Sequence, residues 1–99
     1  MHVRKSSRAE DDLIDIWLYV AARNPQAADR LLDRFEARWR LLATQPRSGA
    51  PRDDLGNGLR TVSVGEYLSI YRLEGSSIEI VRVLHGRRDI TADEVGQAG

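Results

Sequence analysis

The stretch 77–90, SIEIVRVLHGRRDI, restricts the fold of this 99-residue chain more than any other. In an extended conformation its apolar residues fall on both faces, with Ile78, Ile80 and Leu84 on one and Val81 and Val83 on the other. Apolar and β-branched residues on both faces are typical of a strand that is covered on both sides. The strand ends at Gly86, and two arginines follow at its exit. Arg82, inside the apolar run, requires a partner or an open cleft.

The charge balance limits the function classes that suit the chain. Lys plus Arg and Asp plus Glu both number 15, so the formal net charge is zero. That balance speaks against coating nucleic acid by bulk charge, although it permits a local basic patch. Lys5 is the only lysine among the 15 cations. Arginine favours forked hydrogen bonds to carboxylate or phosphate, although a GC-rich genome produces the same bias.

Missing residue types exclude further classes. The chain has no cysteine, which excludes a disulfide, a thiolate nucleophile and a zinc–cysteine site. Its two histidines are too few for a multi-histidine metal site, so we expect no metal and no cofactor. No apolar run approaches the roughly 20 residues that span a bilayer, and the N-terminus lacks the apolar core of a signal peptide. We therefore expect a cytoplasmic protein without membrane contact.

Two amphipathic helices are predicted in the first half of the chain. Ser7 and Glu10 form a capping box for the first helix, which runs to about Ala22. Asn24 caps the second helix, which runs to about Thr44. The short connection predicts an antiparallel hairpin. Apolar residues at helical spacing are Ala9, Leu13, Ile16, Trp17 and Val20 in the first helix, and Ala28, Leu31, Leu32, Phe35, Trp39 and Leu42 in the second.

A row of arginines follows the second helix. Arg30, Arg34 and Arg38 stand four residues apart, so they share one side of the helix. They form either a binding stripe or a solvated face whose aliphatic stems cover apolar surface. We favour the solvated face.

The second half of the chain predicts a sheet. After the long loop 45–58, residues 59–64, 67–73 and 77–85 read as strands of an antiparallel meander with type II′ turns at Gly65 and Gly75. The segment 2–6 is a weaker strand candidate. The predicted fold is α+β: an N-terminal strand, then an antiparallel helical hairpin packed on the meander. We expect one domain over 1–99, with a tail from about residue 92 that forms a very short helix or is disordered.

The two sheet faces differ in polarity. We expect the helices to cover Val62, Val64, Leu68, Ile70, Ile78 and Ile80. The opposite face would hold Thr61, Ser63, Tyr67, Ser69 and Tyr71 beside Val81 and Val83. A half-polar face with aromatic side chains is a candidate cleft, although the tyrosines could equally be cross-strand packing.

Three segments carry a resemblance to a known family: RAEDDLIDIWLYVA, QAADRLLDRFEARWRLLATQPRSGAPR and IEIVRVLHGRRDI. The chain resembles the ParE branch of the ParE/RelE toxin superfamily over nearly its whole length. The resemblance implies the α+β fold described above and the role of a toxin in a type II toxin–antitoxin module. It also implies a ParD-like ribbon-helix-helix antitoxin as partner in a hetero-oligomer.

The superfamily holds two activities. RelE-like members cleave messenger RNA on the ribosome and place basic residues on their strands, where this chain has Leu59, Thr61 and Leu68. Only Arg88 matches a catalytic arginine, and Glu94 or a neighbour stands where a tail tyrosine would. These departures favour ParE-like members, which inhibit DNA gyrase without a recognised active site. Two alternatives stay open: a ribosome-dependent ribonuclease, which would use Arg88 with Arg60 or His85, and a non-toxic relative that only binds the antitoxin.

Two sets of residues follow as site candidates. For target binding or toxicity they are Arg60, Arg82, His85, Arg87 and Arg88, with the strand exit at Arg87 and Arg88 as the centre. For antitoxin binding they are Ile14 and Leu18, which lie off the main helical stripe, and Tyr67 and Tyr71. We predict no catalytic residues, no metal ligands and no sequence-specific nucleic-acid binding by the chain alone.

Overall fold

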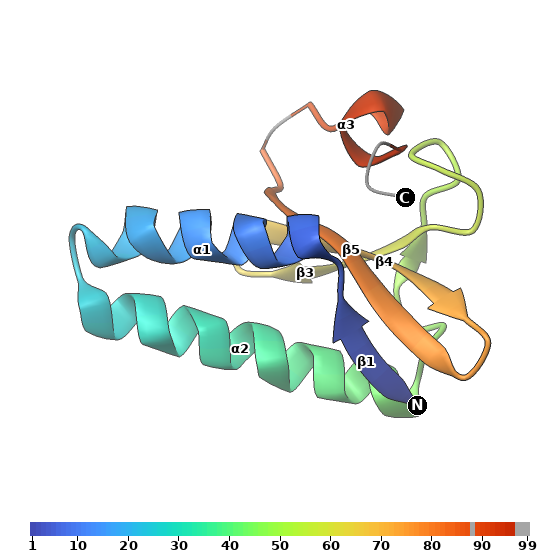
Figure 1. Cartoon of the computed structure of the whole chain (residues 1–99), viewed down its shortest axis with the longest axis horizontal. Helices are drawn as coiled ribbons and strands as arrows, with labels where there is room; N and C mark the ends of the chain where they lie inside the picture. The colour runs from blue at the N-terminus through green and yellow to red at the C-terminus, as the bar shows by residue number, and fades with distance from the viewer. Residues whose placement is uncertain (88, 97–99) are drawn as a thin grey trace.

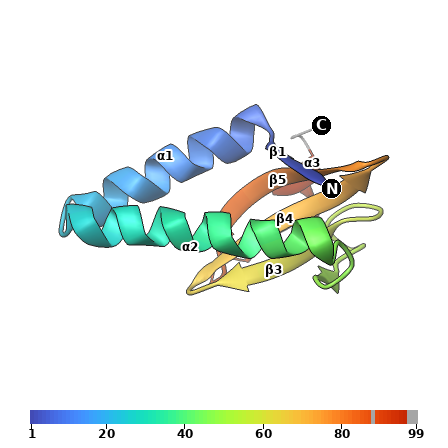
Figure 2. The same cartoon turned by 90° about the horizontal axis from the view of Figure 1, so that it is seen from below.

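A helical hairpin and a five-stranded sheet make up the computed structural model, which describes residues 1–87 and 89–96. The elements are β1 (His2–Lys5), α1 (Ser7–Ala21), α2 (Pro25–Thr44), β2 (Ala50–Pro51), β3 (Arg60–Val64), β4 (Tyr67–Glu74), β5 (Ser77–His85) and α3 (Ala92–Gly96). The strand order is β1-β5-β4-β3-β2, and β1 runs parallel to β5 while the other pairs are antiparallel. Figures 1 and 2 show the hairpin on one side of the sheet and α3 on the other. The predicted α+β fold is confirmed.

The helix starts follow from local capping. Ser6, not Ser7, caps α1, because its Oγ accepts a hydrogen bond from the amide of Ala9 at 3.0 Å. The predicted cap was wrong by one residue, since β1 runs directly into the helix and Ser6 also donates its amide to the carbonyl of Ile80. The start of α2 is as predicted, with the Asn24 side chain accepting from Ala27 and Pro25 at the first position.

A β-bulge in β5 changes which side chains face the helices. Ile70 pairs with Arg82 and Tyr71 with Ile80, which leaves Val81 without an opposite residue. Ile78 and Ile80 therefore face the hairpin before the bulge, and Val83 faces it afterwards. Val81 and Leu84 face the other way. The predicted grouping of Leu84 with Ile78 was wrong because it assumed uninterrupted alternation.

The faces of β4 are also the reverse of the prediction. The turn at 65–66 pairs Val64 directly with Tyr67, and residues opposite each other in a pair share a face. Tyr67, Ser69 and Tyr71 therefore point to the helices together with Val62 and Val64, and Ile70 points away. Among residues 1–87 and 89–96, the other face does not form the predicted half-polar cleft. That face carries a second apolar cluster, which consists of Leu55, Leu59, Ile70, Val81, Leu84 and Val95.

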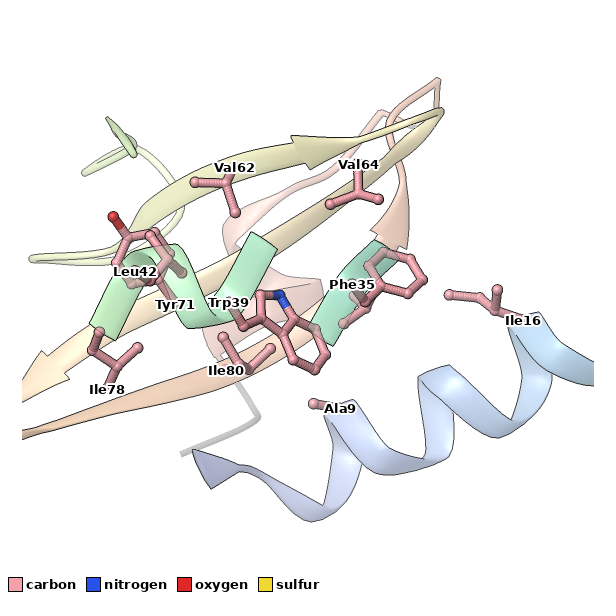
Figure 3. Packing of buried hydrophobic residues seen from close by; sticks show 11 residues of the cluster. Ala9, Ile16, Phe35, Trp39, Leu42, Val62, Val64, Tyr71, Ile78 and Ile80 are labelled. Carbon is pink, nitrogen blue, oxygen red and sulfur yellow. The ribbon is translucent and has the colours of Figure 1, made fainter. Parts of the chain in front are cut away.

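The main core lies between α2 and the sheet. Figure 3 shows Phe35, Trp39 and Leu42 in succession along α2, facing strand residues. Trp39 is 3% exposed, and its Nε1 donates to Ser69 Oγ at 2.9 Å, so the buried polar atoms are paired. Phe35 stacks on Trp39 with ring centroids 5.8 Å apart.

The C-terminal segment covers the second cluster. Residues 92–96 form α3, in agreement with the short helix considered for the tail. Val95 is 1% exposed because it packs into the second cluster. β5 is therefore covered on both sides, as its sequence predicts.

One carboxylate ties α1 to β5. The last residue of β1 pairs with Ile80, so the edge of β5 beyond that point has no neighbouring strand. Asp12 takes that place: its Oδ2 accepts from the amide of Val83 at 2.9 Å and from Arg82 Nε at 2.8 Å, and its Oδ1 accepts from Arg82 Nη2 at 2.9 Å. Arg82 Nη1 donates to the carbonyl of Glu94 in α3 at 2.8 Å. The hydrogen bond that Arg82 donates to Asp12 raises the pKa of Arg82 against the effect of burial, so this guanidinium stays charged.

We expect Trp39→Ala to destabilise the fold by about 3–5 kcal/mol, because it empties the centre of the core and leaves Ser69 without its donor. Urea denaturation followed by circular dichroism measures the change. A midpoint equal to that of the wild type would show that Trp39 is not buried.

We expect Asp12→Ala to cost about 3–5 kcal/mol, because it leaves a buried guanidinium without its carboxylate and a strand amide without its acceptor. The adjacent Asp11 is exposed, so Asp11→Ala should change the free energy of unfolding by only about 0.5 kcal/mol. Adding Arg82→Met to Asp12→Ala should recover part of the loss. Equal losses of unfolding free energy in Asp12→Ala and Asp11→Ala would show that the contacts of Asp12 do not hold α1 to β5.

Candidate functional site

The exit of β5 is fixed to the β3–β4 turn. The amide of Gly86 donates to the carbonyl of Glu66 at 2.7 Å, and a Cβ on Gly86 would lie only 3.1 Å from that oxygen. The amide of Arg87 donates to His85 Nδ1 at 3.1 Å, so the neutral imidazole carries its proton on Nε2. Arg87 Nη2 lies 3.0 Å from Glu66 Oε1, yet the side chain of Arg87 is 82% exposed. The exit therefore holds a solvent-facing guanidinium on a well-anchored backbone.

A concave surface of about 480 Å³ lies between α1 and this exit, and its lining includes Asp15, Tyr19, Glu66, Tyr67 and His85. Tyr67 is half-buried, with its ring edge-on to His85 at 5.3 Å and to Phe35 at 5.9 Å. Burial, together with the negative charge of Glu66 and the neighbouring Tyr19, raises the pKa of Tyr67. Its phenol is therefore protonated at neutral pH and can donate a hydrogen bond.

Three predicted site residues make contacts within the fold. Arg82 is occupied by Asp12 and α3, as described above. Arg60 Nη1 donates to the carbonyls of Gly49 at 2.7 Å and Arg47 at 3.1 Å, which clamps the loop after α2. Tyr71 is fully buried, and its hydroxyl donates to the carbonyl of Pro46. All three thus have internal partners in this structure, and Arg88 lies outside the described residues.

The two helical candidates lie on the exposed surface of α1. Ile14 is 57% exposed and Leu18 is 56% exposed. They border an apolar groove of about 330 Å³ that Leu13, Trp17 and Leu32 complete. Figures 1 and 2 both show that the joined ends of α1 and α2 extend beyond the sheet, so no strand covers this part of the hairpin.

Some residues that line the concave surface and the apolar groove are not among the site residues predicted from the sequence. Trp17 and Leu32 belong to the predicted apolar stripes of the two helices, although both are only partly buried. Asp15 and Tyr19 face the exit of β5 from α1, and their spacing of four from each other is the signal that could have placed them on one side. Glu66 carried no such signal, because its role depends on the approach of Gly86 to a distant turn.

The described residues include neither a cluster of potential metal ligands nor a membrane-spanning helix. In ranges 1–87 and 89–96 no group of three or more His, Asp or Glu side chains is arranged to hold a metal ion. Within the same ranges, no helix combines the length and the apolar character that crossing a membrane requires.

Known proteins are similar to this chain in sequence. A family model described as the ParE toxin of the type II toxin–antitoxin system parDE matches residues 3–90. Toxin ParE3 of Caulobacter vibrioides is 40% identical over 67 residues, which are 68% of this chain and 67% of that toxin. Toxin ParE1 of the same organism is 39% identical over 84 residues, 83% of this chain and 85% of that toxin. Toxin RelE1 of Caulobacter vibrioides is 33% identical over 85 residues, which are 82% of this chain and 88% of that toxin.

A solved structure agrees at the level of the fold. A chain of the chromosomal ParDE toxin–antitoxin system from P. aeruginosa superimposes with a TM-score of 0.72 over 86% of this chain and 95% of that chain, at 24% identity. The family match spans most of the sequence, and two ParE toxins are more than one-third identical to it. This chain therefore belongs to the ParE toxin family of type II toxin–antitoxin systems.

Proposed function

We propose that this ParE-family toxin binds DNA gyrase in the cytoplasm without catalysing a reaction, and that a ParD-like ribbon-helix-helix antitoxin neutralises it in a hetero-oligomer. The observation that carries the proposal is the apolar surface on the exposed side of α1, where Ile14 and Leu18 are more than half exposed. Exposed apolar patches of this kind mark interfaces.

The shape of the apolar surface suits an amphipathic helix of the antitoxin. Ile14 and Leu18 are one turn apart on α1, and the groove beside them is open along both helices. Apolar side chains at helical spacing on a partner helix would fit such a groove. Tyr19, 69% exposed, continues the surface toward Tyr67 at the exit of β5.

Side-chain placement supports a non-enzymatic toxin. Leu59 and Thr61 stand where RelE-like members carry basic residues, and both are buried. Arg60 and Arg82 are engaged by internal partners. RNA cleavage needs a group that activates the 2′-hydroxyl and another that stabilises the phosphorane. The RelE1 relative favours this chemistry as the alternative, with His85 as the candidate base.

The target-binding surface of the proposal is the exit of β5. Arg87 is held by a strand that is covered on both faces, so ordering its backbone costs little on binding. Its exposed guanidinium can make bidentate contacts to a carboxylate or phosphate of the target. Glu66 is the intramolecular competitor for those contacts.

We expect Arg87→Gln with Arg88→Gln to abolish growth arrest when the toxin is expressed without antitoxin, while the melting temperature stays unchanged. The control Arg23→Gln with Arg40→Gln removes the same charge from exposed positions elsewhere and should leave growth arrest intact. Undiminished arrest by the first variant would show that the toxin does not act through this exit.

We expect Ile14→Glu with Leu18→Glu to prevent co-purification with the proposed ParD-like antitoxin, because two charges would enter an apolar interface. Leu41→Glu is the matched control, since Leu41 is 59% exposed on α2 outside the groove. Wild-type complex formation by the double variant would place the antitoxin on another surface.

A further inference from the structure

The arginine row on α2 has no internal role. Arg30, Arg34 and Arg38 form no ion pair or hydrogen bond within ranges 1–87 and 89–96. Arg30 and Arg34 are exposed and Arg38 is half-buried. One step of four residues advances about 6 Å along a helix, so the three guanidinium groups can spread over about 12 Å. The row is a line of evenly spaced cations on one side of α2.

A groove of about 340 Å³ runs beside the row. Arg34, Arg38 and Leu41 form its α2 wall, and Ser63 and Gly65 lie on the wall made by β3 and its turn. Arg34 reaches the turn, since its guanidinium nitrogens lie 3.5 and 3.6 Å from the position of a Cβ on Gly65. Ser63 is exposed, because β2 pairs only with the residues before it on β3. The groove is therefore open, and two arginines line it.

The middle of the row meets the exit of β5 at the β3–β4 turn. Gly65 lies against Arg34, and the next residue, Glu66, binds Arg87. The turn thus separates two guanidinium groups that come from distant parts of the sequence. Together, Arg30, Arg34, Arg38 and Arg87 form an arginine arc along α2 and the turn.

We propose that this arginine arc binds the phosphodiester backbone of duplex DNA without reading its sequence. Evenly spaced guanidinium groups suit a polymer with regularly repeated anions, and arginine binds phosphate in a forked geometry. The zero net charge of the chain leaves this binding local to the arc. The inference stands apart from the antitoxin groove and does not require that gyrase is the target.

The test is fluorescence anisotropy of a short labelled DNA duplex of random sequence, measured with the full chain over a range of salt concentrations. Four phosphate contacts predict a slope of log K against log salt of about −3.6. Arg30→Gln, Arg34→Gln and Arg38→Gln together should reduce the slope by about 3. Arg8→Gln, Arg23→Gln and Arg40→Gln give the same net charge and should leave it unchanged. The lysine version of the first set should keep the slope, which controls for loss of the arginine stems.

Three results would overturn the inference. The first is no duplex binding at low salt, and the second is an equal loss of slope in the two glutamine variants, which would indicate bulk charge. The third is displacement of the duplex by polyglutamate at equal charge concentration, which would assign the arc to an acidic protein segment. Growth arrest and antitoxin binding are measured separately, so these results leave the proposed function untouched.

Discussion

The carboxylate of Asp12 is the contact on which the arrangement of both surfaces depends. β1 covers only the first part of the β5 edge, and beyond it Asp12 accepts from the strand amide of Val83 and from Arg82. The same guanidinium reaches α3, so one tie joins the hairpin, the central strand and the C-terminal helix. A buried ion pair of this kind contributes less than its contacts suggest but is costly to break. Its position just before the exit of β5 holds that exit against α1.

The structure separates stability from recognition. The core beneath α2 and the second cluster beneath α3 enclose β5 and give the domain its rigidity. Recognition surfaces remain where this covering ends. The outer side of α1 exposes Ile14 and Leu18, and the exit of β5 exposes Arg87. In the proposed function these are the antitoxin and target surfaces, and Tyr19 lies between them.

The sequence predicted local structure well and side-chain faces less well. Helical periodicity, the Asn24 cap and the glycines of the turns depend on neighbouring residues, so both helices and three strands were placed within about two residues. Gly65 and Gly75 indeed have positive φ, and the residues after them do not, as type II′ turns require. The bulge at Val81 depends on tertiary pairing, and it invalidated the face predicted for Leu84. The face of Tyr71 could have been derived from the two-residue turn. The internal partners of Arg60 and Arg82 could not be predicted, because the loop after α2 and Asp12 are distant from them in the sequence.

The proposed action on gyrase is tested by measuring DNA supercoiling by purified gyrase with this chain added. The account predicts that the chain blocks supercoiling and that its antitoxin restores it, while translating ribosomes supplied with the same protein show no new cuts in messenger RNA. Normal supercoiling, combined with cuts in the ribosomal A site that vanish in Arg88→Ala, would contradict the account and identify a ribonuclease.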